Sequence, residues 1–186
     1  YGCIHKFAEK LGVSLDDYGI CVINARGQSS IKPLRQLFTF FAIPSLAIYD
    51  GDVKGGHAAA PDEFFTTELC FEIEIVKTLF AAGKTELVRK IALDMDSNAC
   101  SVSLDTDFVR NHFRKMSIDI TGYTPKKLSD VSDNDEEDFC RMFSAWFMAK
   151  KGVLLGRIIG DATPAENIPA CYSNAIQKAQ EVVING

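Results

Sequence analysis

The sequence predicts an α/β fold in which a parallel sheet is followed by a large helical part. Two observations indicate this fold. Short, uninterrupted apolar segments alternate with helical periodicity up to residue 52, and almost everything after residue 62 has a helical period. Strands without a polar face are typical of parallel sheets that helices cover on both sides. We therefore expect an α/β core over residues 1–62 and a mainly helical remainder over residues 63–186.

The first four predicted elements are a helix, a strand, a helix and a strand. Apolar residues spaced three and four apart from Ile4 share one helix face, and Gly12 ends that helix. The β-branched run 20–23 predicts a fully buried strand. Residues 31–41 predict a second helix, and the apolar run 46–49 predicts a second strand.

The second half of the chain is predicted to be helical, after a loop rich in Gly, Ala and Pro over residues 53–62. Its periodicity predicts helices near residues 66–82, 84–97, 105–116, 133–150, 152–160 and 166–184. The acidic run 133–138 is interpreted as a first helical turn whose carboxylates complement the helix dipole, in preference to a metal site.

Composition limits the classes of partner. The 186 residues include 20 basic and 25 acidic side chains, a net charge of −5, so any contact with nucleic acid must be local or assisted by a metal. No apolar run approaches the ~18 residues of a membrane span, and no basic leader precedes an apolar block. We expect a cytoplasmic protein without a membrane partner. Six cysteines without a C-x-x-C pair are expected to be reduced, buried thiols.

Two aspartates, Asp50 and Asp52, directly follow the second predicted strand. Ligands bind at the carboxyl ends of parallel strands. On an extended chain, alternate residues point the same way, so both carboxylates are expected to face one small volume. Two such anions repel each other unless a cation lies between them, and Mg²⁺ or Mn²⁺ prefers oxygen ligands. Gly55 completes a D-x-D-x-x-G pattern; from the residues alone, a tight turn with solvated carboxylates is the alternative.

These segments resemble a known family. The stretches 8–12, 19–24 and 43–52 look like the TOPRIM region of OLD (overcoming lysogenization defect) ATP-dependent endonucleases, a group that includes the Gabija defence nuclease. The resemblance implies a TOPRIM-like, Rossmann-like parallel sheet and a metal-dependent endonuclease that nicks or cuts DNA with two Mg²⁺ or Mn²⁺ ions. It further implies a homo-oligomer through the full-length protein, a helicase-like or defence partner, and ATP use only through an N-terminal domain absent from this chain.

The same resemblance implies roles for particular acidic residues. Asp50 and Asp52 would be metal ligands of the catalytic site. A further carboxylate is expected on the next helix, from Glu72 or Glu74, and the family's pairing of an aromatic residue with Glu favours Glu72. Only one of the two can face the metals, because residues two apart on a helix differ by about 200°.

Basic and backbone contacts are also implied. The family places a lysine near the scissile phosphate at the start of a late helix, which here points to Lys151 or its neighbour Lys150; paired lysines that simply cap a helix C-terminus are the alternative. Gly27 and Arg26 follow the first predicted strand and are candidates for DNA contact. His57 lies in the loop beside the aspartates and is interpreted as a loop residue; the other histidines, 5 and 112, are interpreted as structural or exposed.

The chain departs from the family pattern at its start. The pattern begins with a strand that ends in a catalytic Glu, within an E-G-x-x-E stretch before the first helix, whereas this chain begins at that helix. We expect the strand and its Glu to lie upstream, and the chain by itself to lack one main metal ligand and nuclease activity. The alternative from another class is a non-catalytic α/β regulatory or protein-interaction domain, with or without bound Mg²⁺.

Overall fold

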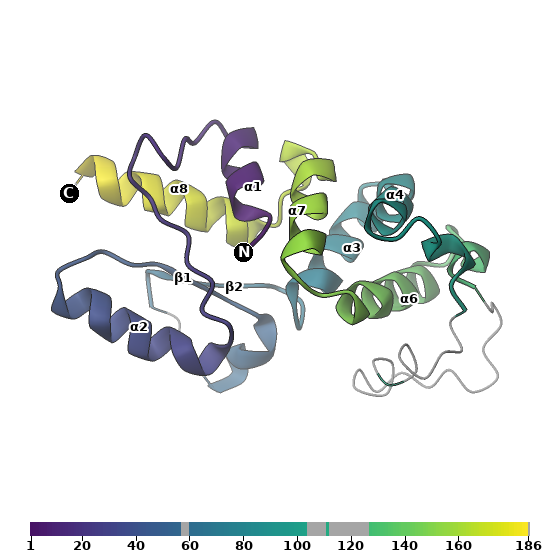
Figure 1. Cartoon of the computed structure of the whole chain (residues 1–186), viewed down its shortest axis with the longest axis horizontal. Helices are drawn as coiled ribbons and strands as arrows, with labels where there is room; N and C mark the ends of the chain where they lie inside the picture. Colours follow the sequence, from purple (N-terminus) through teal and green to yellow (C-terminus); the bar gives the residue numbers. More distant parts are fainter. Residues whose placement is uncertain (57–59, 104–110, 112–126, 186) are drawn as a thin grey trace. The chain divides into compact units, whose positions relative to one another are not determined.

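The computed structural model describes residues 1–56, 60–103, 111 and 127–185. It is a mixed α/β structure with a short parallel sheet and mostly helical content, as the sequence predicts (Figure 1). The chain divides into two compact units, which are described separately: the first holds residues 1, 3–71 and 164–186, and the second holds residues 2 and 72–163. The predicted division into domains at residues 62 and 63 stays a prediction.

The first unit contains the sheet. Its helices are α1 (Ile4–Lys10), α2 (Gln28–Phe40) and α8 (Ala170–Asn185), its strands are β1 (Ala47–Tyr49) and β2 (Glu63–Phe65), and its 3-10 helices are η1 (Gly51–Gly56) and η4 (Ala165–Asn167). The predicted helices near residues 4–11, 31–41 and 166–184 and the predicted strand 46–49 are confirmed, with bounds that differ by a few residues.

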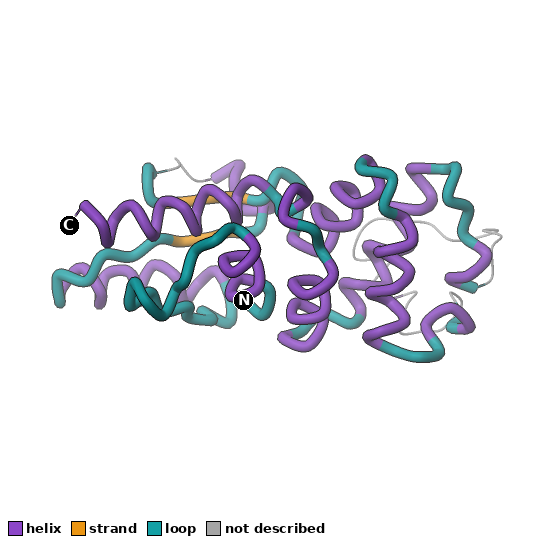
Figure 2. Tube along the Cα trace, turned by 90° about the horizontal axis from the view of Figure 1, so that it is seen from above, coloured by secondary structure: helices purple, strands orange, loops and turns teal. Residues whose placement is uncertain are grey.

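The two strands run parallel, with Ala47 beside Glu63 and Tyr49 beside Phe65. Helix α8 packs against both strands and α1 packs against α8. In Figure 1, α1 and α8 lie above the sheet and α2 lies below it; Figure 2 shows the strands in orange among these helices. The sequence did not predict β2, because three residues that begin with a glutamate give neither an apolar run nor an alternation long enough to read.

The strand predicted over residues 20–23 is wrong. The segment has no regular secondary structure, and within the described chain residues 21–25 contribute no backbone–backbone hydrogen bond. Cys21 and Ile23 are exposed. An apolar run becomes a strand only where a neighbouring strand pairs with its N–H and C=O groups. The expectation of buried thiols therefore also fails at Cys21, although all six cysteines are free and four of them are buried.

An aromatic cluster forms the core of the first unit. Phe7 of α1 is fully buried, and its ring centroid lies 5.8 Å from that of Tyr172 of α8. Phe71 joins them, with its ring 6.4 Å from Phe7 and 5.0 Å from Tyr172. The cluster holds α1, α8 and the segment after β2 together.

The second unit is helical. Its elements are α3 (Phe71–Ala81, whose first residue belongs to the first unit), α4 (Thr85–Met95), η2 (Ala99–Ser101), η3 (Leu128–Asp130), α6 (Glu136–Ala149) and α7 (Val153–Ala162). They confirm the helices predicted near 84–97, 133–150 and 152–160, while the helix predicted near 66–82 begins later. The helix predicted over 105–116 lies outside the described residues apart from residue 111. None of the helices in the described chain combines the length and apolar character that a bilayer span needs.

Large side chains of α6 fill the core of this unit. Trp146, Phe139 and Phe143 are fully buried, and the rings of Phe139 and Phe143 stack with centroids 4.4 Å apart. The interpretation of the acidic run as a helix start is confirmed, because the Asp135 side chain accepts a hydrogen bond from the Asp138 N–H at 3.0 Å and caps α6.

Candidate metal site

The two aspartates of the candidate site flank the start of a 3-10 helix. β1 ends at Tyr49, Asp50 follows half-buried, and η1 begins at Gly51, so that Asp52 is exposed in its first turn. The expected period-two alignment of the carboxylates is therefore wrong, since the chain stops being extended after Asp50. What the two side chains share is one short loop at the carboxyl end of a parallel strand.

A buried threonine holds this loop from behind. Gly51 N–H donates to Thr66 Oγ1 at 2.7 Å, and the Thr66 hydroxyl donates to the Glu68 carbonyl at 2.8 Å. The Thr66 N–H donates to the Tyr49 carbonyl at 3.0 Å. Thr66 is 0% exposed, so water does not compete for these bonds. Sequence reasoning missed Thr66, because an isolated threonine after a three-residue strand gives no signal.

Two more hydrogen bonds join the aspartates to the segment that leads into α3 and to the first residue of that helix. An Asp50 carboxylate oxygen accepts from the Phe71 N–H at 3.3 Å, and the Asp52 N–H donates to the Leu69 carbonyl at 3.3 Å. The loop after β1 and the loop after β2 are thus paired through both backbone and side chain. The Asp52 carboxylate is left at the surface, where a ligand can reach it.

Gly51 is required by this packing. A Cβ atom at Gly51 would lie 2.2 Å from the Glu68 carbonyl oxygen and 2.7 Å from that of Thr66, which no real side chain tolerates. The middle residue of the Asp-Gly-Asp sequence therefore allows close approach of two backbone segments.

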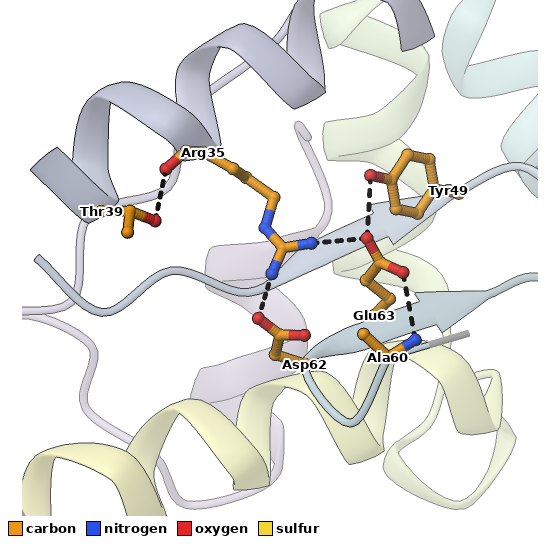
Figure 3. A network of polar contacts seen from close by, with 6 residues as sticks. All are labelled: Arg35, Thr39, Tyr49, Ala60, Asp62 and Glu63. Atoms are coloured by element: carbon orange, nitrogen blue, oxygen red, sulfur yellow. Dashed lines mark hydrogen bonds and ion pairs between the residues drawn. The ribbon is translucent and has the colours of Figure 1, made fainter. Parts of the chain in front are cut away.

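A polar network supports the strand that leads into the site (Figure 3). Arg35 of α2 pairs with both Asp62 and Glu63, and the Tyr49 hydroxyl donates to Glu63 Oε1 at 3.3 Å. The Ala60 N–H donates to the other Glu63 oxygen at 3.1 Å. Burial, and next the negative charge of Glu63, raises the pKa of Tyr49. Burial lowers the pKa of Arg35, but the attraction of Asp62 and the other partners outweighs it, so that this pKa is raised.

The predicted acidic and basic residues of the helical unit form two separate pairs. Glu72 and Lys151 meet, with Lys151 Nζ 3.4 Å from Glu72 Oε2. The Glu72 side chain is 6% exposed and that oxygen has no hydrogen bond of good geometry, whereas the Lys151 side chain is 56% exposed. Glu74 is also buried. The Glu72 carboxylate is buried and its cationic partner Lys151 is partly solvated, so Glu72 is able to exchange Lys151 for another cationic ligand.

Lys150 has different partners. Its ammonium lies 3.3 Å from Asp96 Oδ2 and 5.6 Å from the centre of the Trp146 ring. The backbone N–H of Asn98, and next the Lys150 ammonium, lowers the pKa of the Asp96 carboxyl. Lys150 is therefore engaged in holding the end of α6, while its neighbour Lys151 faces Glu72.

The remaining candidates lie away from these groups or outside the described chain. Arg26 and Gly27 are exposed, with φ of 58° and 147°, and the Asn24 side chain accepts from the Arg26 N–H at 2.9 Å. Gly27 immediately precedes α2. His5 is exposed on α1, and His57 lies outside the described residues, as does the third histidine.

The donor chemistry of the Asp50–Asp52 loop fits a hard divalent cation. Mg²⁺ is commonly bound through one or two carboxylates and keeps several waters, and the loop offers two carboxylates, one of them exposed. Among the residues that the structure describes, no three His, Cys, Asp or Glu side chains gather into a larger ligand set. The loop therefore fits a solvated Mg²⁺ or Mn²⁺ ion rather than an ion enclosed by protein.

A match to a known family ends in this loop. Residues 1–52 match the TOPRIM domain of overcoming lysogenization defect (OLD) protein-like proteins. The match ends at the second aspartate, so it includes Asp50 and Asp52 but neither the Glu72–Lys151 pair nor Lys150. No curated protein matches the chain.

The fold of the chain is similar to that of one solved structure, described as the C-terminal region of the Burkholderia pseudomallei OLD protein. The likeness has a TM-score of 0.55 at 16% sequence identity and covers 97% of this chain and 91% of that one. At this identity the likeness concerns the fold. It includes the helical unit as well as the sheet, so both units have the arrangement of elements found in an OLD C-terminal region.

Proposed function

We propose that this chain is the metal-dependent, DNA-cleaving part of an OLD-like ATP-dependent endonuclease, with Asp50 and Asp52 as ligands of Mg²⁺ or Mn²⁺. The observation that supports this most is the position of the two aspartates, in one short loop at the carboxyl end of β1 and inside the segment that matches the OLD-like TOPRIM domain. Divalent ions bound there supply an activated water and charge stabilisation on the phosphate.

The aspartates have complementary tasks in this proposal. Asp50 is half-buried and held by the Phe71 N–H, so it fixes the inner side of the site. Asp52 is exposed and offers its carboxylate to an ion that still carries water and phosphate oxygens. A chain with a net charge of −5 needs such an ion to approach a phosphodiester.

We assign the helical unit's contribution to Glu72 and Lys151. Lys151 is the more suitable phosphate ligand of the two neighbouring lysines, because its side chain is more than half exposed while Lys150 pairs with Asp96 and lies over Trp146. Glu72 pairs with Lys151 and is the carboxylate of this unit that we assign to the metals.

DNA contact outside the site is assigned to the loop before α2. Arg26 supplies an exposed positive charge, and Gly27 allows the backbone to approach a phosphate closely. ATP hydrolysis, oligomerisation and any helicase-like or defence partner belong to the longer OLD-like protein in this proposal.

Metal binding by the chain tests the proposal directly. Titration with Mn²⁺, followed by electron paramagnetic resonance of the free ion, should give binding that Asp50→Asn and Asp52→Asn each weaken at least tenfold. Asp17→Asn is the matched control, since Asp17 is exposed in a turn of the same unit. Binding by both site variants that equals wild type would show that the aspartates are not ligands.

Cleavage is tested on the natural protein that contains this segment. It should nick supercoiled plasmid with Mg²⁺ or Mn²⁺ and not with chelator, and Asp50→Asn, Asp52→Asn and Lys151→Met should each reduce nicking while Asp17→Asn does not. Metal binding without nicking by the natural protein would favour a non-catalytic, Mg²⁺-binding role.

A further inference from the structure

We infer that Thr66 is a positioning residue for the metal-binding loop: its hydroxyl joins Gly51, between the two aspartates, to Glu68 and so holds the carboxylates in place before any ion binds. The inference rests on the proposed function, since it concerns the affinity of the same loop for Mg²⁺ or Mn²⁺. It adds a residue that lies outside the segment matching the OLD-like TOPRIM domain model, which ends at Asp52.

The hydroxyl both accepts and donates. Thr66 Oγ1 accepts from the Gly51 N–H at 2.7 Å and donates to the Glu68 carbonyl at 2.8 Å. A hydroxyl group makes both bonds from one oxygen atom, because it is a donor and an acceptor at once. A methyl group in the same place would make neither bond. Thr66 is 0% exposed, so solvent does not compete for either bond.

The position of Gly51 makes the bond effective. Gly51 is the residue between Asp50 and Asp52. A shift of its backbone therefore changes the direction of both carboxylates. No room exists for a compensating movement toward β2, because even a Cβ atom on Gly51 would lie 2.2 Å from the Glu68 carbonyl oxygen. Removing the hydroxyl therefore frees the loop to move away from Thr66.

Groups that orient metal ligands affect affinity without touching the ion. Loss of such a partner typically costs 10–100-fold in metal affinity. We expect Thr66→Val, which keeps the shape of the side chain, to weaken Mn²⁺ binding by at least tenfold, and Thr66→Ser, which keeps the hydroxyl, to bind within about threefold of wild type.

Mn²⁺ titration of the whole chain, followed by electron paramagnetic resonance, gives the affinities. Thr39→Val is the matched control: it also removes a hydroxyl that bonds a backbone carbonyl, that of Arg35 at 2.9 Å, but on α2. Circular dichroism verifies that each variant is folded at the temperature of the titration. Wild-type affinity in Thr66→Val would overturn the inference and leave the proposed metal site intact, whereas failure of the wild type to bind Mn²⁺ would overturn both.

A second measurement does not require the valine variant to fold. The amide hydrogen of Gly51 in the wild-type, metal-free chain should exchange with solvent at least tenfold more slowly than that of Ile23, which lies in an exposed irregular segment, because the acceptor of the Gly51 amide is a buried hydroxyl. Exchange of Gly51 as fast as that of Ile23 would mean that the loop is not held before metal binding and would overturn the inference.

Discussion

Replacing Arg35 by methionine should destabilise the first unit by about 2–4 kcal/mol, the sum of two unequal losses. The Glu63 side chain is 6% exposed and loses a charge-assisted hydrogen bond, which costs about 1.5–3 kcal/mol when the partner stays buried. The Asp62 side chain is 38% exposed, so water screens it and its loss is about 0.2–1 kcal/mol. The methionine retains part of the packing of the arginine stem.

Urea unfolding followed by far-ultraviolet circular dichroism measures this loss. Fluorescence of Trp146, the only tryptophan of the chain, reports separately on the second unit and should change little. Arg26→Met is the control, because Arg26 is exposed, and it should lie within about 0.5 kcal/mol of wild type. In the double variant Arg35→Met/Glu63→Gln, the loss should be smaller than the sum of the two single losses, since each already breaks the same pair.

A loss for Arg35→Met no larger than that for Arg26→Met would refute the reasoning. It would also be refuted if the losses of unfolding free energy for Arg35→Met and Glu63→Gln added up in the double variant, because the two side chains would then not depend on each other. Either result would remove the network from the set of interactions that hold the end of β1 beside the candidate site.

Three further predictions concern single contacts. Gly51→Ala should lower both the Mn²⁺ affinity and the thermal midpoint of the first unit, because the added methyl group meets a carbonyl oxygen at 2.2 Å; unchanged affinity would show that the loop adapts. Arg89→Met should destabilise the second unit by about 1–3 kcal/mol in urea unfolding followed by tryptophan fluorescence, because the guanidinium donates to the Val131 carbonyl at 2.7 Å and to Asp133; a wild-type midpoint would contradict this. Asp96→Asn should lower the thermal midpoint at neutral pH, and its difference from wild type should shrink as pH falls through the depressed pKa of Asp96: a lowered pKa stabilises the fold above the ordinary carboxyl value and ceases to do so when the group is protonated. A difference that is the same at neutral and acidic pH would exclude ionisation as the cause.

The helices could be predicted because their signals are local. The start of α6 is an example: the acidic run and the capping Asp135 lie within one turn of each other in the sequence, and they bond each other in the structure. Helical periodicity does not depend on the surface against which a helix packs, so six of the helices in the described residues appear close to where the pattern places them.

Strands could be predicted only in part, because a strand is defined by its neighbour. The apolar segment 20–23 has the composition of a buried strand and forms none, while Glu63–Phe65 forms β2 beside β1 without an apolar pattern of its own. In each case, a strand forms only if another backbone segment lies within hydrogen-bonding distance. A short stretch of sequence does not show whether such a segment is present.

The candidate site shows the same division between residue type and geometry. Asp50 and Asp52 are recognisable from the sequence, since two like charges after an apolar run are unusual. Their relative orientation was predicted from an extended chain and is wrong, because Gly51 already begins η1. The chemistry of the donors could be predicted and their directions could not.

Thr66 follows from the register of the sheet. Tyr49 lies beside Phe65 in the parallel pair, so the next residues along each strand, Asp50 and Thr66, leave the sheet at the same level. Two parallel strands that end together bring the loops that follow them into contact, and here that contact includes the peptide between the two aspartates. In the described part of the chain, the two three-residue strands of this sheet therefore place an acidic loop, and one buried hydroxyl joins the segments that follow them.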